Sequence, residues 1–187
     1  MRNIESTGNV KLLTIRTKLN HVQAQDPVDQ KRIVGYRLLQ WTWGLPQTML
    51  GAILYQRYRN CPHTTFHGAS VTIWPQRSSL SLGMFLFVSK ELFPNKQKEP
   101  PTFRHGTFAR RLLVHEYGHT IQSLMFGPLY LLTVGLPSIT WANLPAFQKY
   151  RKRNQKSYYA VYPEIHADRL GERVLHERAV GAVYTDF

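Results

Sequence analysis

The chain has 187 residues and a formal net charge of +13, with 24 Lys and Arg against 11 Asp and Glu. This length is enough for one domain with a sizeable core, and the single cysteine, Cys61, excludes an intramolecular disulfide and a cysteine-based zinc site. The basic excess favours an anionic partner or membrane surface; no nucleic-acid-binding signature is present, so we expect no nucleic acid.

The first 30 residues are polar and lack a secretory signal peptide. We therefore expect a lead-in over residues 1–30, a single domain over residues 31–187, and a chain that is cytoplasmic as synthesised. Residues 31–58 carry apolar side chains at helical spacing, which predicts a helix interrupted at Gly44-Leu45-Pro46.

Two segments rich in Val, Ile, Phe and Trp follow, residues 66–74 and 80–89, on either side of Pro75-Gln76-Arg77-Ser78. Their partial alternation predicts a β-hairpin. Residues 95–101 predict a polar connector that contains proline. The expected fold class is α+β: a mainly helical single domain with a β-hairpin or small antiparallel sheet before the next helix.

That helix, residues 107–125, contains the motif His115-Glu116-Tyr117-Gly118-His119. Thr107 is a candidate N-cap, and Gly127-Pro128 is a strong stop. Residues four apart share one helix face, so both imidazoles can hold one metal ion, with Glu116 beside its open position. H-E-x-x-H on a helix is a signature of zinc metallopeptidases.

Two stretches lack charged residues, 38–56 and 120–148. The second is long enough to span a bilayer, but its glycines and prolines favour a hydrophobic loop and a short helix. The basic run that follows, 149–156, predicts a solvated loop between helices, although it also suits the cytoplasmic side of a membrane. Membrane association is therefore an open alternative.

A third metal ligand is expected on a second helix, residues 159–177, where Pro163 fits the first turn. Glu164 and Asp168 are four residues apart and share a face. Glu164 would bind the metal, and Asp168 would accept a hydrogen bond from the outer nitrogen of a ligating histidine. The competing third ligand is His166, roughly 160° from Asp168 around the helix. A solvated acidic helix start is the other alternative.

The pattern H-E-x-x-H followed by E-x-x-x-D is similar to that of the gluzincins, the thermolysin-like metallopeptidases. The resemblance implies a zinc site with three ligands: His115, His119 and Glu164. It implies that Glu116 is the catalytic base and that Asp168 supports the first histidine. It also implies that an edge strand within residues 80–88 binds the substrate in extended form; the alternative is a strand that only covers the core.

The chain also resembles small, mostly uncharacterised proteins of Bacteroidetes that occur alone or at the C-termini of Rhs-type, toxin-like proteins. Within residues 33–172 the shared motifs are W-T-W-x-L-P-Q-T, S-L-G, H-E-Y-G-H-x-x-Q-S, G-P-L-Y-L, G-x-P-S and E-x-x-A-D-R-L-G. This resemblance implies a toxin-like effector that a cognate inhibitor or immunity protein neutralises. In that group a Trp often stands at the position of His166.

Together these patterns predict a zinc-dependent hydrolase, most directly a metallopeptidase that cleaves a peptide or protein. Zinc would activate a water molecule, and Glu116 would move its proton to the leaving amine. The candidate oxyanion donors are Tyr158, Tyr159, Tyr162 and His176. The alternative is a non-enzymatic module that is metal-stapled or membrane-associated. A fourth protein ligand, such as His166 or His105, would favour that alternative.

Overall fold

The structure is a computed structural model that describes residues 27–93 and 103–181. The chain divides into two compact units, residues 1–35 and residues 36–187. Most of the predicted lead-in and the whole predicted connector, residues 95–101, lie outside the described residues. The second unit contains both the sheet and the H-E-x-x-H motif.

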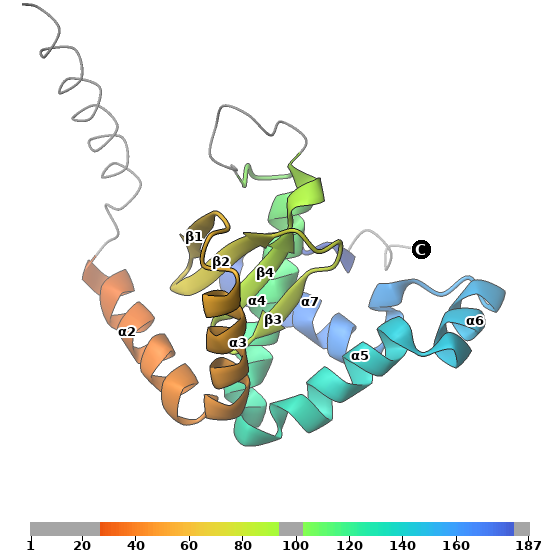
Figure 1. Cartoon of the computed structure of the whole chain (residues 1–187), viewed down its shortest axis with the longest axis horizontal. Helices are drawn as coiled ribbons and strands as arrows, with labels where there is room; N and C mark the ends of the chain where they lie inside the picture. The colour runs from red at the N-terminus through yellow and green to blue at the C-terminus, as the bar shows by residue number, and fades with distance from the viewer. Residues whose placement is uncertain (1–26, 94–102, 182–187) are drawn as a thin grey trace, which may run out of the picture. The chain divides into compact units, whose positions relative to one another are not determined.

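The fold class is α+β, as predicted. The helices are α2 (Pro27–Thr42), α3 (Leu45–Arg57), α4 (Phe108–Phe126), α5 (Leu136–Asn143), α6 (Pro145–Arg153) and α7 (Tyr162–Leu175). Short helical turns are η1 (Lys90–Leu92), η2 (Gly127–Leu129), η3 (Leu131–Gly135) and η4 (Tyr158–Ala160). The strands, shown with the helices in Figure 1, are β1 (His63–Phe66), β2 (Ala69–Trp74), β3 (Leu80–Leu82) and β4 (Phe85–Ser89).

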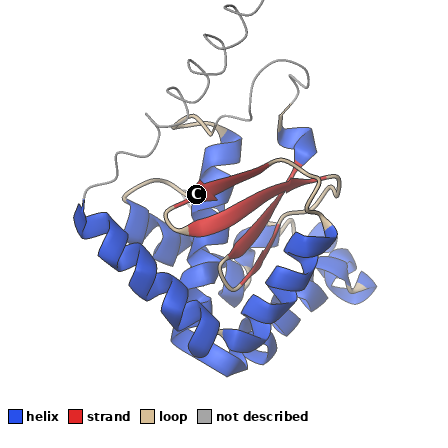
Figure 2. Cartoon of the chain, turned by 60° about the vertical axis from the view of Figure 1, so that its left-hand side comes forward, coloured by secondary structure: helices blue, strands red, loops and turns tan. Residues whose placement is uncertain are grey.

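The four strands form one mixed sheet in the order β1-β2-β4-β3 (Figure 2). The predicted hairpin between residues 66–74 and 80–89 is wrong, because β2 and β4 pair in parallel, with Ser70 opposite Phe85. Each of them instead forms a tight antiparallel pair with its neighbour, β1 with β2 and β3 with β4. These local hairpins leave β3 at one edge of the sheet.

The hydrophobic core is centred on β4, whose five residues are all buried. A strand covered on both faces is expected to be apolar throughout rather than alternating, and Phe85-Leu86-Phe87-Val88 follows that pattern. Helices α3 and α4 both contact this strand. Leu113 of α4 is fully buried in the same cluster, so the core holds the motif-bearing helix against the sheet.

The three predicted main helices are confirmed. The predicted interrupted helix is α2 followed by α3, with the break before Leu45. The motif-bearing helix is α4, where the side chain of Thr107 accepts a hydrogen bond from the N–H of Arg110 at 3.3 Å. This helix ends at Gly127, whose φ of 51° suits glycine. The second helix is α7, with Pro163 in its first turn.

The predicted loop at residues 149–156 is wrong, because α6 covers its first five residues. A proline in the first turn and a run of Lys, Arg and Gln favour a short helix there. In the described part of the chain, no single helix is long and apolar enough to cross a membrane. The segments Phe108–Leu129 and Leu131–Asn143 meet that test only as a pair, and they are bent by 119°.

Candidate metal centre

Helices α4 and α7 lie against each other, and glycines bring their backbones into contact. A Cβ atom at Gly118 would collide with the carbonyl group of Ala167, and one at Gly171 would collide with the carbonyl group of Val114. Interiors are close-packed, so such collisions would force the two helices apart. The close approach holds the start of α7, including Glu164, over the motif face of α4.

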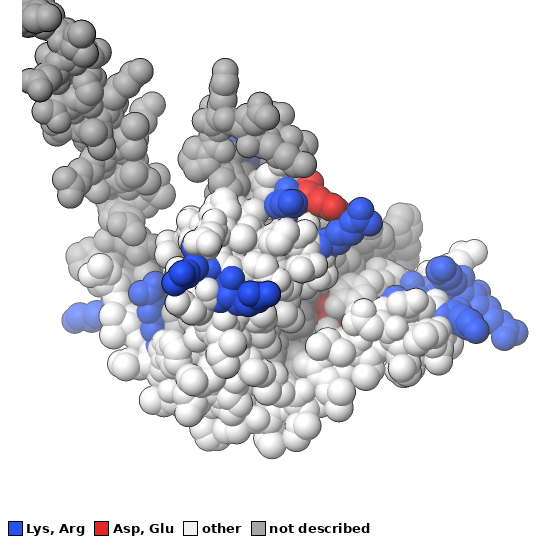
Figure 3. Space-filling view, viewed as in Figure 1, with Lys and Arg blue, Asp and Glu red and all other residues white. Residues whose placement is uncertain are grey.

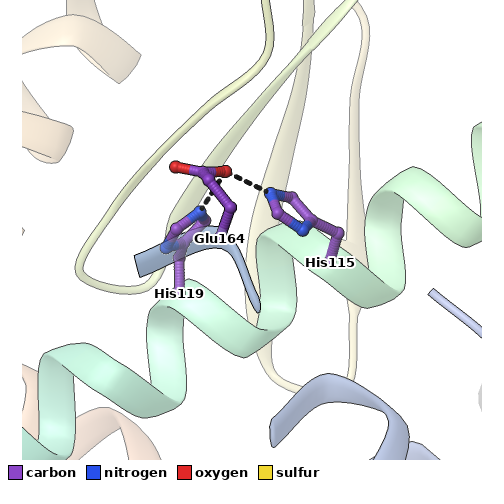
Figure 4. Close-up of side chains that lie close together, drawn as sticks. All are labelled: His115, His119 and Glu164. Carbon is purple, nitrogen blue, oxygen red and sulfur yellow. Dashed lines mark ion pairs between the residues drawn. The ribbon is translucent and has the colours of Figure 1, made fainter. Parts of the chain in front are cut away.

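Three side chains from these helices converge on one point (Figure 4). His115, His119 and Glu164 each offer one ligand atom, and these atoms all lie within 4.8 Å of one another. The Oε2 atom of Glu164 lies 3.1 Å from Nε2 of His115 and 3.5 Å from Nε2 of His119. All three residues are buried.

The tautomer of His115 is fixed by Asp168. The Nδ1 atom of His115 lies 2.8 Å from Oδ1 of Asp168. An ionised carboxylate only accepts hydrogen bonds, so the Nδ1 atom carries the proton. In a neutral imidazole the other nitrogen then holds a lone pair. Nε2 of His115 therefore presents a lone pair to the cluster, as the predicted role of Asp168 requires.

The tautomer of His119 is fixed by Gln122, a residue for which the sequence alone predicts no role in the site. The Nε2 atom of Gln122 donates to the carbonyl oxygen of Pro163 at 2.8 Å, so its amide oxygen points the other way. That oxygen lies 2.7 Å from Nδ1 of His119, which must donate to it. Nε2 of His119 therefore also presents a lone pair.

The carboxylate of Glu164 has one satisfied and one unsatisfied oxygen. Oε1 accepts a hydrogen bond from the hydroxyl of Ser138 at 2.5 Å. Oε2 is buried and has no hydrogen-bond partner among the described residues. A buried, unpaired carboxylate oxygen facing two nitrogen lone pairs is costly unless a cation lies between them. The donor set therefore fits a metal ion bound by two imidazoles and one carboxylate.

The electrostatics of the cluster favour positive charge. Burial alone would lower the pKa of His115, but the neighbouring carboxylates of Asp168 and Glu164 raise it to about 10, so a metal would have to displace a proton from the ring. Burial would raise the pKa of Glu164, but the two histidines hold it well below its usual range. The residues thus stabilise a carboxylate beside a positive charge, which is also what a divalent metal would require.

The cluster opens onto a cavity of about 760 Å³. Residues 79–82, which include β3, line one side, and residues from η3 and α5 line the other. The space-filling view shows this hollow between uncharged surfaces, with part of an Asp or Glu residue visible at its floor (Figure 3). His115 and His119 both line the cavity, so a metal held by them would face open space.

Among the residues that the structure describes, no fourth His, Cys, Asp or Glu joins the three ligand atoms. His105 instead lies 3.1 Å from the carboxylate of Glu177. His166 accepts a hydrogen bond from Gln122 at 3.2 Å, and its ring stacks on that of Tyr162. The structure therefore places both alternative ligands outside the group.

Glu116 also lines the cavity. Its Oε2 atom accepts a hydrogen bond from the hydroxyl of Ser81 at 2.5 Å. Burial raises the pKa of the Glu116 carboxyl, while His115 and His119 act in the opposite direction. Ser81 is the middle residue of the edge strand β3, so the strand beside the cavity also positions this carboxylate.

Two of the four candidate oxyanion donors line the cavity, Tyr158 and Tyr159. The hydroxyl of Tyr158 lies 3.3 Å from that of Ser138, and burial raises its pKa. The ring of Tyr159 lies edge-on to His115. Tyr162 is 53% exposed, and His176 caps the far end of α7; neither lines the cavity.

Four residues that take part in the site have no role predicted from the sequence: Ser81, Gln122, Tyr130 and Ser138. Gln122 is three residues after His119, and this spacing alone places it on the same helix face. Ser81, Gln122 and Ser138 also fall within the S-L-G, H-E-Y-G-H-x-x-Q-S and G-x-P-S motifs. Their partners come from other elements, so the motifs marked these residues without revealing what they contact.

Comparison of the chain with family models, with curated proteins and with solved structures gives no match. The gluzincin-like and toxin-like resemblances therefore stay predictions. Any inference about function rests on the geometry of the site itself.

Proposed function

We propose that this chain is a zinc-dependent peptidase whose metal is held by His115, His119 and Glu164. One observation carries the proposal: two imidazole nitrogens and an unpaired carboxylate oxygen converge at the wall of an open cavity. Two imidazoles and one carboxylate suit zinc with a free fourth position. When bound, zinc would polarise a substrate carbonyl and make a water molecule more acidic.

In this proposal Glu116 carries the proton. Burial raises the pKa of its carboxyl above the usual value, which makes the carboxylate a stronger proton acceptor. The hydrogen bond from Ser81 restricts its rotation. Glu116 follows His115 directly and lines the same cavity, so it can accept the proton of the attacking water and deliver it to the leaving amine.

The edge strand favours an extended peptide as substrate. Of the described strands, only β4 pairs with β3, and β3 lines the cavity. An unpaired strand edge binds an extended chain through main-chain hydrogen bonds. Leu136 and Ile139 on the opposite wall would contact apolar side chains of the peptide. Tyr158, kept protonated by its raised pKa, would donate a hydrogen bond to the developing oxyanion.

The test combines metal analysis with cleavage of a peptide library. We expect about one zinc per chain in the wild type and in Glu116→Gln, because Glu116 is not a ligand. We expect metal loss in His115→Ala and Glu164→Ala, and cleavage by the wild type alone. Cleavage that survives Glu116→Gln would refute the role of this base. A folded wild type that binds no metal would refute the centre and favour a non-enzymatic interaction module.

A further inference from the structure

The two uncharged stretches, residues 38–56 and 120–148, have polar side chains on the inside. Gln40 donates to the carbonyl oxygen of Thr120 at 2.9 Å and accepts a hydrogen bond from Ser123 at 2.9 Å. Gln47 donates to the hydroxyl of Ser123 at 2.8 Å. Gln40, Gln47 and Ser123 are fully buried. This network joins α2, α3 and α4, so the contact between these helices is polar.

The outside of the same stretches is apolar. We call this surface the apolar face; it includes Leu38, Trp43, Ile53, Leu129, Leu132 and Ile139, all exposed. Exposed fractions reach 61% for Ile53 and 65% for Leu132. A helix on the surface of a protein in water normally has the opposite arrangement, with polar residues outward. A contiguous exposed apolar surface typically marks a site of contact with a protein or a membrane.

The two stretches form one continuous surface. Gln47 of α3 donates to the carbonyl oxygen of Gly127 at 3.1 Å. The ring of Trp43 packs directly over Gly127. The break before α3 and the turn after α4 are therefore in contact. Figure 3 shows the lower part of this view without a single Lys, Arg, Asp or Glu.

Basic residues border the apolar face. The first stretch begins after Arg37 and ends before Arg57, and the second ends before Lys149. Three further basic residues lie in the last turn of α6. In Figure 3 the blue side chains flank the uncharged surface and extend beyond it at the tip of α6. An apolar surface with a basic margin is complementary to a bilayer with anionic headgroups.

We propose that the apolar face inserts into the surface of a lipid bilayer with anionic headgroups, while the basic margin contacts those headgroups. Trp41 and Trp43 are both exposed on this face, and tryptophan is enriched at membrane–water interfaces. Leu136 and Ile139 are exposed and also line the cavity. Resting on the proposed peptidase function, this geometry implies that the substrates are polypeptide segments at the membrane surface.

The test is vesicle sedimentation of the full-length chain with phosphatidylcholine–phosphatidylglycerol vesicles. We expect the wild type to bind and its tryptophan emission to shift to shorter wavelength. Leu132→Glu and Ile53→Glu should each weaken binding about tenfold or more, because a large apolar side chain leaves the bilayer. Val174→Glu, a matched change at a 46% exposed position of α7, should bind like the wild type. Circular dichroism melting confirms that each variant is folded.

A wild type that stays in solution with these vesicles would overturn the proposal. So would an equal loss of binding in Val174→Glu, because the effect would then be charge alone. A dimer that Leu132→Glu dissociates, without vesicle binding, would assign the face to a second copy and overturn the proposal too. Binding is also measured on Glu116→Gln, which should sediment like the wild type, so failure of the peptidase proposal leaves this result unaffected.

Discussion

Gln122 links His119 to the residue that precedes Glu164, because its amide oxygen accepts from His119 at 2.7 Å and its amide nitrogen donates to Pro163. The other two candidate ligands have supports of their own. Asp168 holds His115, and Ser138 holds Glu164. Each ligand is therefore oriented by a different side chain, and such support sharpens metal affinity.

Replacing Gln122 tests this support. Gln122→Leu removes the acceptor for His119 Nδ1–H and frees the ring to rotate or change tautomer. We expect zinc affinity to fall about 10- to 100-fold, measured by competition with a chromophoric chelator. The matched control is Gln76→Leu, a change at an exposed position that contacts Tyr58. Equal affinities for the two variants would contradict the orienting role.

Gly118→Ala tests the contact between α4 and α7. In an open helix this change stabilises by about 1 kcal/mol, but here the new Cβ would collide with the carbonyl group of Ala167. Overpacking of this kind costs about 1–3 kcal/mol. We expect a lower melting temperature and weaker zinc binding, since Glu164 is displaced. Gly135→Ala is the control, because its nearest neighbour lies at an ordinary 3.7 Å; equal melting temperatures would refute the collision.

Tyr158→Phe tests the proposed oxyanion donor. The change keeps the ring and removes only the hydroxyl. We expect kcat to fall about 100-fold, as for other single oxyanion donors, with metal content and KM little changed. Tyr162→Phe, outside the cavity, should have full activity. Full activity of Tyr158→Phe would transfer the role to another phenol of the cavity, such as Tyr130.

Metal removal should destabilise the fold. Chelation removes the metal beside the buried Oε2 atom of Glu164, and the free energy of metal binding is lost. At a free metal concentration of 100 times Kd that contribution is about 2.7 kcal/mol. We expect the chelator to lower the melting temperature of the wild type and to leave that of Glu164→Gln unchanged. An unchanged wild type would show that the cluster does not hold a metal in the folded protein.

Glu177 gives a pH dependence with a definite sign. The hydrogen bond from Arg110 lowers the pKa of its carboxyl, against the opposing effect of burial. A carboxyl whose pKa is lower in the folded than in the unfolded state stabilises the fold at pH values above the unfolded pKa, about 4.3. This stabilisation is lost as the pH falls through the folded-state pKa. The melting temperature of Glu177→Gln should therefore lie further below that of the wild type at pH 7 than at pH 3.

The exposed pair of Arg77 and Glu91 provides the control for this experiment. Their side chains are 88% and 54% exposed, so solvent screens the interaction. We expect Glu91→Gln to melt close to the wild type at both pH values. If Glu177→Gln behaved in the same way, the pair of Arg110 and Glu177 would not stabilise the packing of α7 on α4.

The parts of the fold and site that were predictable depend on local spacing. The helix around His115 follows from apolar periodicity and from the cap and stop at Thr107 and Gly127. The pairing of Glu164 with Asp168 follows from their spacing of four residues. These relations are set within one helix, so a single sequence contains them.

The parts that were not predictable depend on contacts between elements. In the sheet, β2 and β4 pair in parallel, and each also pairs antiparallel with its neighbour in sequence, β1 or β3. The roles of Ser81 and Ser138 require β3 and α5 to lie beside the cluster. Hydrophobic patterning sets which face of a strand is buried, but it does not specify the neighbouring strand.

The division of the candidate ligands between α4 and α7 has a consequence for synthesis. Glu164 follows His119 by 164 − 119 = 45 residues. A nascent chain therefore exposes both histidines and Glu116 while α7 is still within the ribosome. At that stage the third ligand and the support of His115 are missing. Under the proposed function, hydrolysis would therefore begin only after α7 docks on α4.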